Sequence, residues 1–191
     1  MPFLRQPSQP NPHPIVIFGS IYFHKINKMK YLLLLLTTIM TFSAARSQAL
    51  PPYQQYKTIP SVRLLSADST GWELKAKLQK NKPVMMMIFS PECDHCKHET
   101  EELIKNIDKF RDIQIIMATP LPLKEMAAFA AHYKLHQYSN ILVGKDYAFA
   151  LPSYYNIKNL PFHAFYNSNK QLISGFEGSM SVPTILKIFG K

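Results

Sequence analysis

The apolar and polar positions of the chain divide most sharply between residues 84 and 110. Val84–Phe89 is an unbroken apolar run that ends at a Ser-Pro dipeptide. Such a run predicts a strand that is covered on both faces. Apolar residues then recur at helical spacing up to Phe110, so we expect a helix over 93–110. Its exposed face is expected to carry Glu99, Glu101, Glu102, Lys105, Asp108 and Lys109.

Strand and helix patterns alternate along the rest of the chain. Further strands are predicted at 62–65, 113–118, 141–143, 162–166 and 171–176. Further helices are predicted at 72–79, 124–133, 146–155 and 181–190. Alternation followed by a closing hairpin predicts an α/β fold, with a central mixed sheet flanked by helices on both faces.

The N-terminal region has the pattern of a cleavable leader. Lys30 precedes an apolar run from Tyr31 to Phe42, and small residues end the segment at Ala49. This layout is that of a signal peptide over 29–49, and the run is short for a transmembrane helix. We expect cleavage after Ala49 and an exported protein, either periplasmic or extracellular.

The segments on either side of this leader have simpler interpretations. Residues 1–28 are rich in proline, and we interpret them as a spurious extension upstream of a true start at Met29. Residues 50–60 hold three prolines and are predicted to be a linker. The domain itself is expected over 61–191.

Charge adds little to this picture. The 191 residues carry a formal net charge of +10, and residues 50–191 carry +5 because the leader holds five basic residues and no acid. No basic stripe is interleaved with aromatic residues, so nucleic-acid binding is not expected.

Cys93 and Cys96 are the two cysteines of the chain, and they lie where the buried strand gives way to the helix. The first turn of a helix has unpaired N–H groups and a partial positive charge, which favour a thiolate at Cys93. Cys96, one turn later, is placed to close a disulfide with it. The pattern therefore favours a redox dithiol.

Other uses of the pair remain open at this point. It could form half of a zinc site with His95 and His98, or a structural disulfide, although so short a loop adds little stability. Haem attachment of the c type requires a histidine where Lys97 stands. The alternative function is a non-catalytic protein that binds a metal or a partner through Cys93, Cys96 and His98.

With these residues in view, the sequence resembles the thioredoxin superfamily and, within it, the TlpA-like exported thiol–disulfide oxidoreductases. The resemblance covers roughly residues 60–191. It rests on Val84–Phe89, Cys93-Asp94-His95-Cys96, the helix behind them, Leu160-Pro161, the hairpin and the last helix. It implies a thioredoxin-like fold with an insertion at about 135–155. It also implies a cis proline at Pro161, which with Leu160 would bind the substrate chain.

The resemblance also implies the roles of the site residues. Cys93 would attack a disulfide and Cys96 would resolve the mixed disulfide. Apart from the resemblance, the positive charge of a protonated His95 is expected to favour the thiolate of Cys93. No cofactor is expected. The partners would be the thiols and disulfides of exported proteins, and an unidentified electron donor that could be membrane-bound.

The sequence departs from the family at three places near the cysteines. Glu92 stands where the family has tryptophan, and Met87 stands where thioredoxin has a buried aspartate. Between the cysteines, Asp94-His95 stands in place of Gly-Pro. The remaining histidines have no partner evident from sequence and are assigned to the surface or the core. They are His98, His132, His136 and His163.

Overall fold

The computed structural model describes residues 28–36 and 50–191. They belong to two compact units, Met1–Ala49 and Leu50–Lys191. In the first unit residues 28–36 are helical, and the rest of the predicted signal peptide and extension, with the cleavage site, lies outside the described residues. Across the described ranges, every helix is too short or too polar to span a bilayer.

Residues 50–191 are built around a seven-stranded sheet with the order β2-β1-β5-β4-β3-β6-β7. Its strands are β1 (Arg63–Leu65), β2 (Gly71–Glu73), β3 (Val84–Ile88), β4 (Gln114–Thr119), β5 (Ile141–Lys145), β6 (Phe162–Tyr166) and β7 (Leu172–Glu177). β3, β4 and β5 are parallel, whereas β6 is antiparallel to β3 and β7 to β6. The predicted mixed sheet is confirmed.

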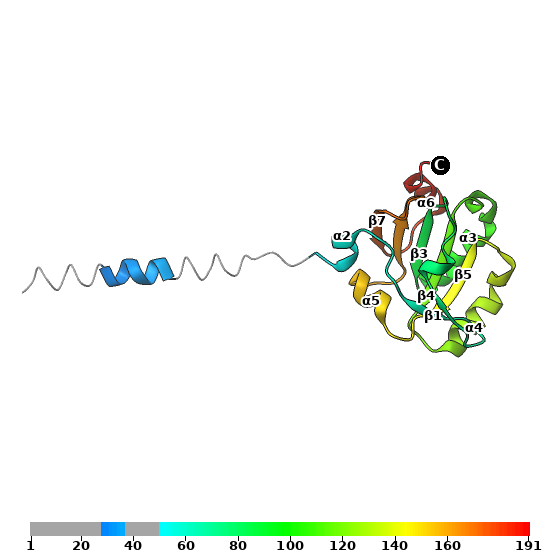
Figure 1. Ribbon diagram of the computed structural model, residues 1–191, viewed down its shortest axis with the longest axis horizontal. Helices are drawn as coiled ribbons and strands as arrows, with labels where there is room; N and C mark the ends of the chain where they lie inside the picture. The colour runs from blue at the N-terminus through cyan, green and yellow to red at the C-terminus, as the bar shows by residue number, and fades with distance from the viewer. Residues whose placement is uncertain (1–27, 37–49) are drawn as a thin grey trace, which may run out of the picture. The chain divides into compact units, whose positions relative to one another are not determined.

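Helices cover both faces of this sheet (Figure 1). The longer helices are α2 (Pro52–Tyr56), α3 (Asp94–Lys105), α4 (Leu123–His132), α5 (Ala150–Tyr155) and α6 (Val182–Ile188). Short 3-10 turns are η1 (Lys75–Lys77), η2 (Ile107–Phe110) and η3 (Leu135–Gln137). α3, α4 and α6 pack on one face of the sheet, and α2 and α5 pack on the other.

β3 lies at the centre of the core, and all five of its residues are buried. Met85 and Met87 point into the cluster beneath α3, and Met86 points into the cluster on the opposite face. Successive strand residues face opposite ways, so the three methionines pack in two separate layers. The expectation of core packing is confirmed.

The predicted helix at 72–79 is wrong. Residues 71–73 form β2, which pairs with β1 across a tight turn, and η1 follows. The buried Gln114 side chain fixes the end of η1. It accepts the Gln79 N–H at 2.8 Å and donates to the Lys77 carbonyl at 2.8 Å. The pairing of β2 with β1 and the hydrogen bonds of Gln114 therefore decide the structure of residues 72–79, despite their helix-like pattern.

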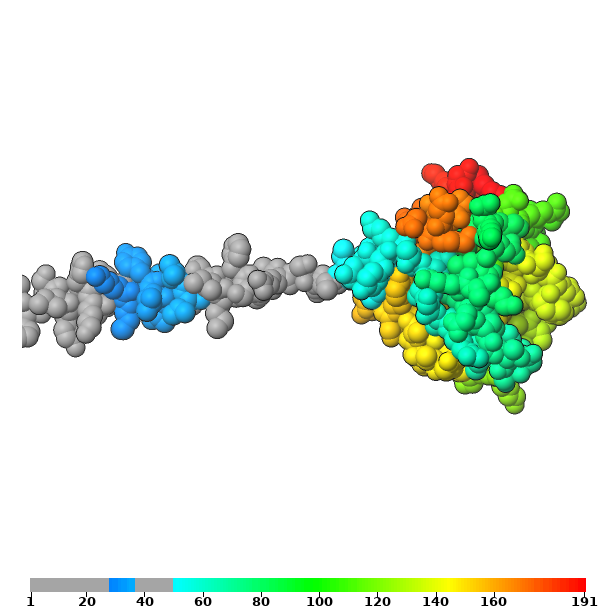
Figure 2. Space-filling model, viewed as in Figure 1, coloured from blue at the N-terminus to red at the C-terminus, as the bar shows by residue number. Residues whose placement is uncertain are grey.

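Residues 50–60 differ from the expected linker, because they fold onto the domain. Tyr53 and Ile59 are buried, and the Leu172 N–H donates to the Lys57 carbonyl at 2.8 Å. Thr58 forms an isolated bridge with Gln171 beside β7. Figure 2 shows this segment (cyan) against α5 (yellow to orange) on the surface of the domain.

We therefore predict that Ile59→Ala destabilises the domain. Ile59 is 1% exposed, and removing a buried isoleucine side chain costs about 2–5 kcal/mol. Urea unfolding of the chain measures this free energy. The matched control is Tyr56→Ala, since Tyr56 is 63% exposed and its loss should change stability little. Equal effects of the two changes would contradict the assignment of this segment to the core.

Candidate functional site

The register of two strands brings the predicted site residues together. β3 pairs with β6 so that Ile88 lies opposite Phe162. The C-terminal end of β3, which leads to Cys93, lies beside the N-terminal end of β6, which follows Pro161. The cysteine loop and the Leu160–Pro161 corner are therefore neighbours, although 67 residues separate Cys93 from Leu160.

Cys93 is the N-cap residue of α3, and its side chain is half-buried. Its Sγ accepts the backbone N–H of Cys96 at 3.3 Å and lies 4.0 Å from the Leu160 carbonyl oxygen. The Cys96 N–H and the N-terminal end of α3 both face this sulfur. The predicted nucleophile thus lies at the N-terminus of α3 and is partly exposed to solvent.

Cys96 lies one turn further along, and it is fully buried. Burial raises the pKa of the Cys96 thiol far above its ordinary value, and its contacts with Cys93 act in the same direction. Both cysteines are free thiols here. Cys96 is therefore protonated at neutral pH and must lose a proton before it can attack a sulfur.

The Leu160–Pro161 peptide bond is cis, as expected. Glu177 on β7 fixes the two residues that precede Leu160. Its carboxylate accepts the Lys158 N–H at 2.8 Å and an Asn159 side-chain amide N–H at 3.0 Å. The Gly178 N–H donates to the Pro161 carbonyl at 2.8 Å. Leu160 remains partly exposed beside Cys93, which is the place the prediction gave it.

The residues between and before the cysteines face water. Glu92, Asp94 and His95 are exposed, and the Asp94 carboxylate pairs with Lys97 at 3.0 Å. Solvent screens charges at such positions strongly. The tuning of Cys93 by His95 stays a prediction.

Glu99 was expected on the exposed face of the helix, and this is wrong. Glu99 is 3% exposed, and its Oε1 lies 2.7 Å from Nε2 of His163, which is fully buried. Its other oxygen accepts the Met180 N–H at 3.1 Å. Two ionisable groups that the sequence had left without a role thus meet in the core, beneath the cysteines.

Two patterns in the sequence could have indicated this pair. Glu99 is three residues after Cys96 and four before Leu103, and both of these are buried, so it falls on the inward stripe of the helix. His163 alternates with Phe165 on β6 and faces the same cluster.

Comparisons with known proteins rest on structure alone, because no family model and no curated protein matches the sequence. A secreted Mycobacterium tuberculosis disulfide oxidoreductase homologous to E. coli DsbE superposes with a TM-score of 0.57 at 15% identity, covering 68% of this chain and 95% of that one. The exposed lipoprotein thioredoxin Etrx1 of Streptococcus pneumoniae gives 0.51 at 22% identity, covering 69% and 100%. StoA of Bacillus subtilis gives 0.53 at 12% identity, covering 70% and 98%.

The chain has a thioredoxin fold. This fold explains why the two cysteines and the cis proline meet at one end of the neighbouring strands β3 and β6. The Glu99–His163 contact depends in addition on these two side chains. Within 28–36 and 50–191, no three His, Cys, Asp or Glu residues cluster in a way that could hold a metal ion.

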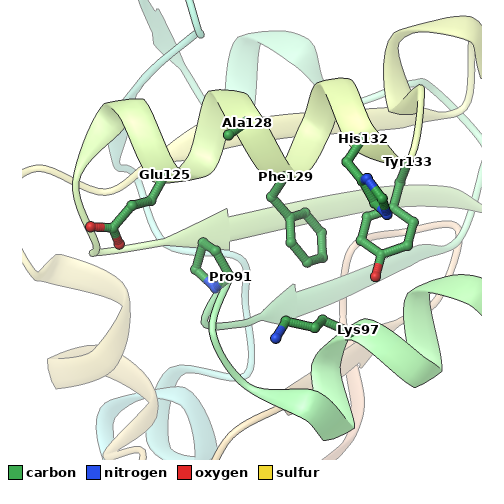
Figure 3. Close-up of a pocket in the computed structure, with 7 residues that line it drawn as sticks. All are labelled: Pro91, Lys97, Glu125, Ala128, Phe129, His132 and Tyr133. Atoms are coloured by element: carbon green, nitrogen blue, oxygen red, sulfur yellow. The ribbon is translucent and has the colours of Figure 1, made fainter.

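A hollow of about 330 Å³ lies beside the cysteine loop of the thioredoxin fold, between α3 and α4 (Figure 3). Phe129 points from α4 toward Pro91, which is two residues before Cys93, and these two rings form its apolar floor. Lys97, Glu125 and His132 stand around it with Tyr133 and Ala128. The hollow can accept an apolar side chain beside Pro91.

We predict that Cys93 alone reacts with iodoacetamide at neutral pH in the reduced protein. The thiolate is the reactive form, and burial keeps Cys96 protonated because it raises the pKa of that thiol. Mass spectrometry of the digested protein locates the modification. In Cys93→Ser the chain should stay unlabelled until it is unfolded in denaturant. Equal labelling of both cysteines in the folded chain would contradict the assignment.

Proposed function

We propose that the protein is a thiol–disulfide oxidoreductase that exchanges disulfides with other proteins through Cys93 and Cys96. One observation carries the proposal. A half-buried sulfur lies at the N-terminus of α3, 4.0 Å from the carbonyl oxygen of Leu160, and a second thiol is buried one turn behind it. The thioredoxin-fold neighbours whose names describe disulfide oxidoreduction support the same chemistry.

The reaction proceeds through a mixed disulfide. The Cys93 thiolate attacks one sulfur of a protein disulfide and forms a new S–S bond, and the other substrate sulfur leaves as a thiolate. Cys96 then attacks Cys93, the substrate leaves reduced, and the Cys93–Cys96 disulfide remains. An electron donor that reduces this disulfide completes the cycle, and the reverse sequence would oxidise a dithiol substrate.

The surface around Cys93 suits an extended polypeptide as substrate. The backbone at Leu160 and Pro161 lies beside the sulfur, where main-chain groups can hold a strand. On the other side, the hollow at Pro91 and Phe129 can receive an apolar side chain near the target cysteine. The site is thus open to a protein segment and offers backbone and apolar contacts rather than a charged pocket.

Export of the chain is part of this proposal. The leader pattern over 29–49 supports it, and two of the similar structures belong to proteins described as secreted or exposed. Compartments outside the cytoplasm allow disulfides in proteins to persist, so substrates would be available there.

We predict that both cysteine substitutions impair insulin reduction by dithiothreitol but leave different products. Cys93→Ser removes the nucleophile and should abolish the acceleration. Cys96→Ser should also slow turnover, because the resolving sulfur is missing. Mixed with insulin in the absence of dithiothreitol, reduced Cys96→Ser should accumulate a covalent complex that added dithiothreitol then releases. Non-reducing electrophoresis separates the outcomes. A wild-type chain that gives no acceleration would contradict the proposed function.

For the leader, we predict that the exported protein begins at Leu50. N-terminal sequencing of the protein recovered from the medium or the periplasm measures this. Replacing Ala49 with a bulky residue should retain the uncleaved form, since cleavage requires a small residue there. A mature protein that still begins at Met1 or Met29 would contradict the prediction.

A further inference from the structure

The segment that leads into β3 carries a run of lysines that the exchange mechanism does not use. Between Glu73 and Glu92 the chain has no acidic residue, and its four lysines are Lys75, Lys77, Lys80 and Lys82. The first three are exposed, and we call them the basic pole. Among the residues that the structure describes, no carboxylate lies at ion-pair distance from any of the four.

The backbone that bears the basic pole is held in place by two side chains from other parts of the fold. Gln114 bonds to the backbone of Lys77 and Gln79, as described above. The Lys170 ammonium group donates to the Gln79 carbonyl at 2.7 Å and to the Lys82 carbonyl at 2.6 Å. Four side-chain hydrogen bonds therefore fix this segment, and little backbone order has to be gained when its lysines bind a ligand.

The carboxylates at this end of the sheet, where β3 and β4 begin, already have cationic neighbours. These are Glu73, opposite Arg63 in the pairing of β1 with β2, Asp108, 2.7 Å from Arg111, and Asp112, 3.2 Å from Lys191. The lysines of the basic pole are thus an excess of positive charge rather than members of surface ion pairs. An excess of one sign attracts a ligand of the opposite sign.

The basic pole and the cysteines lie at opposite ends of the central strand. The lysines precede β3 and Cys93 follows it, and the five residues of the strand, at about 3.3 Å each, separate the two ends by roughly 17 Å. The exposed residues next to Cys93 in the chain, Glu92 and Asp94, are acidic. The basic pole can therefore bind an anionic ligand while the cysteines stay accessible.

The composition of the basic pole indicates which kind of anionic ligand it fits. Its cations are all lysines, which are hydrated point charges without the planar fork by which arginine binds single phosphates. No large apolar side chain is exposed between residues 74 and 83. Protein interfaces are depleted in lysine and centre on apolar or aromatic anchors, and single-stranded nucleic acids require aromatic stacking. The face of a bilayer that contains anionic lipids requires neither.

We propose that the basic pole binds the surface of a membrane that contains anionic phospholipids, and that the bound protein holds its cysteines on the side away from the bilayer. This interaction goes beyond the exchange function and does not depend on it. The binding is peripheral and weakens with salt, because solvent and ions screen exposed charges. It confines the protein to the membrane surface and leaves the cysteines open to proteins in the surrounding medium.

Co-sedimentation with lipid vesicles tests this inference. Residues 50–191 form a compact unit with its own core, so they can be prepared without the leader, whose apolar run would bind lipid by itself. The vesicles contain phosphatidylcholine alone, or phosphatidylcholine with phosphatidylglycerol, at low and at physiological salt. We expect binding only to the vesicles with phosphatidylglycerol, and weaker binding as the salt concentration rises.

Two double variants separate the basic pole from net charge. Replacing Lys77→Gln and Lys80→Gln should weaken partitioning onto the anionic vesicles about 25-fold, because each lysine near such a surface contributes about fivefold. Lys124→Gln with Lys158→Gln is the matched control. It removes the same charge from two exposed positions at the cysteine end, and it should weaken partitioning by about twofold at most. Circular dichroism checks that both variants are folded.

Alkylation of Cys93 by iodoacetamide measures the orientation of the bound protein. The rate on anionic vesicles should equal the rate in solution, because the cysteines lie at the end of the sheet opposite the basic pole. Strong protection of Cys93 by the vesicles would place the cysteine end on the lipid and overturn the inference.

Other outcomes would also overturn it. These are equal binding to neutral and anionic vesicles, equal losses in the two double variants, and no binding to either kind of vesicle. Retention of the wild-type domain on duplex DNA, without binding to vesicles, would assign the basic pole to nucleic acid instead. None of these results bears on insulin reduction, so the exchange function is judged separately.

Discussion

The antiparallel pairing of β3 with β6 is the constraint on which the site depends. It aligns Ile88 with Phe162, and the proposed site residues follow β3 and precede β6 at this same end of the pairing. A shift of one residue would turn the side chains of β6 to the opposite face of the sheet. His163 would then leave Glu99, and the Leu160–Pro161 corner would move away from Cys93. Since both strands are buried on both faces, this register is strongly specified.

The same pairing brings a glutamate and a histidine together inside an apolar layer. β6 supplies His163, α3 supplies Glu99, and the loop before α6 supplies an N–H from Met180. Three separate segments must therefore be in place before these polar groups meet. A buried pair of this kind gives little net stability, and removing one partner leaves the other without its neighbour.

Much of the fold could be predicted from the pattern of the sequence. The unbroken apolar run gave the central strand, and the capping residue Ser181 with Pro183 gave the start of α6. Cys93 and Cys96 could be assigned because a strand, a break and an amphipathic helix surround them. Leu160 and Pro161 could be assigned only through resemblance to a known family, since spacing along the chain does not reveal a neighbour on another strand.

The errors have a common physical origin. Residues 72–79 look helical in isolation, but pairing with β1 and the two hydrogen bonds of Gln114 decide their structure. Glu99 looks like a surface residue because glutamate usually is one. Its burial depends on His163, which is 64 residues away in the chain, and no local pattern connects the two. Contacts made across such distances are the part of the structure that single-sequence reasoning misses.

The segment before β1 has a further consequence for the behaviour of the protein in solution. β7 is the last strand of the sheet, and residues 57 and 58 bond to its outer side near Leu172 and Gln171. An open strand edge is a template on which a second molecule can add its own strand. Residues 57 and 58 cover part of that edge, which leaves less of it open to the strand of a second molecule.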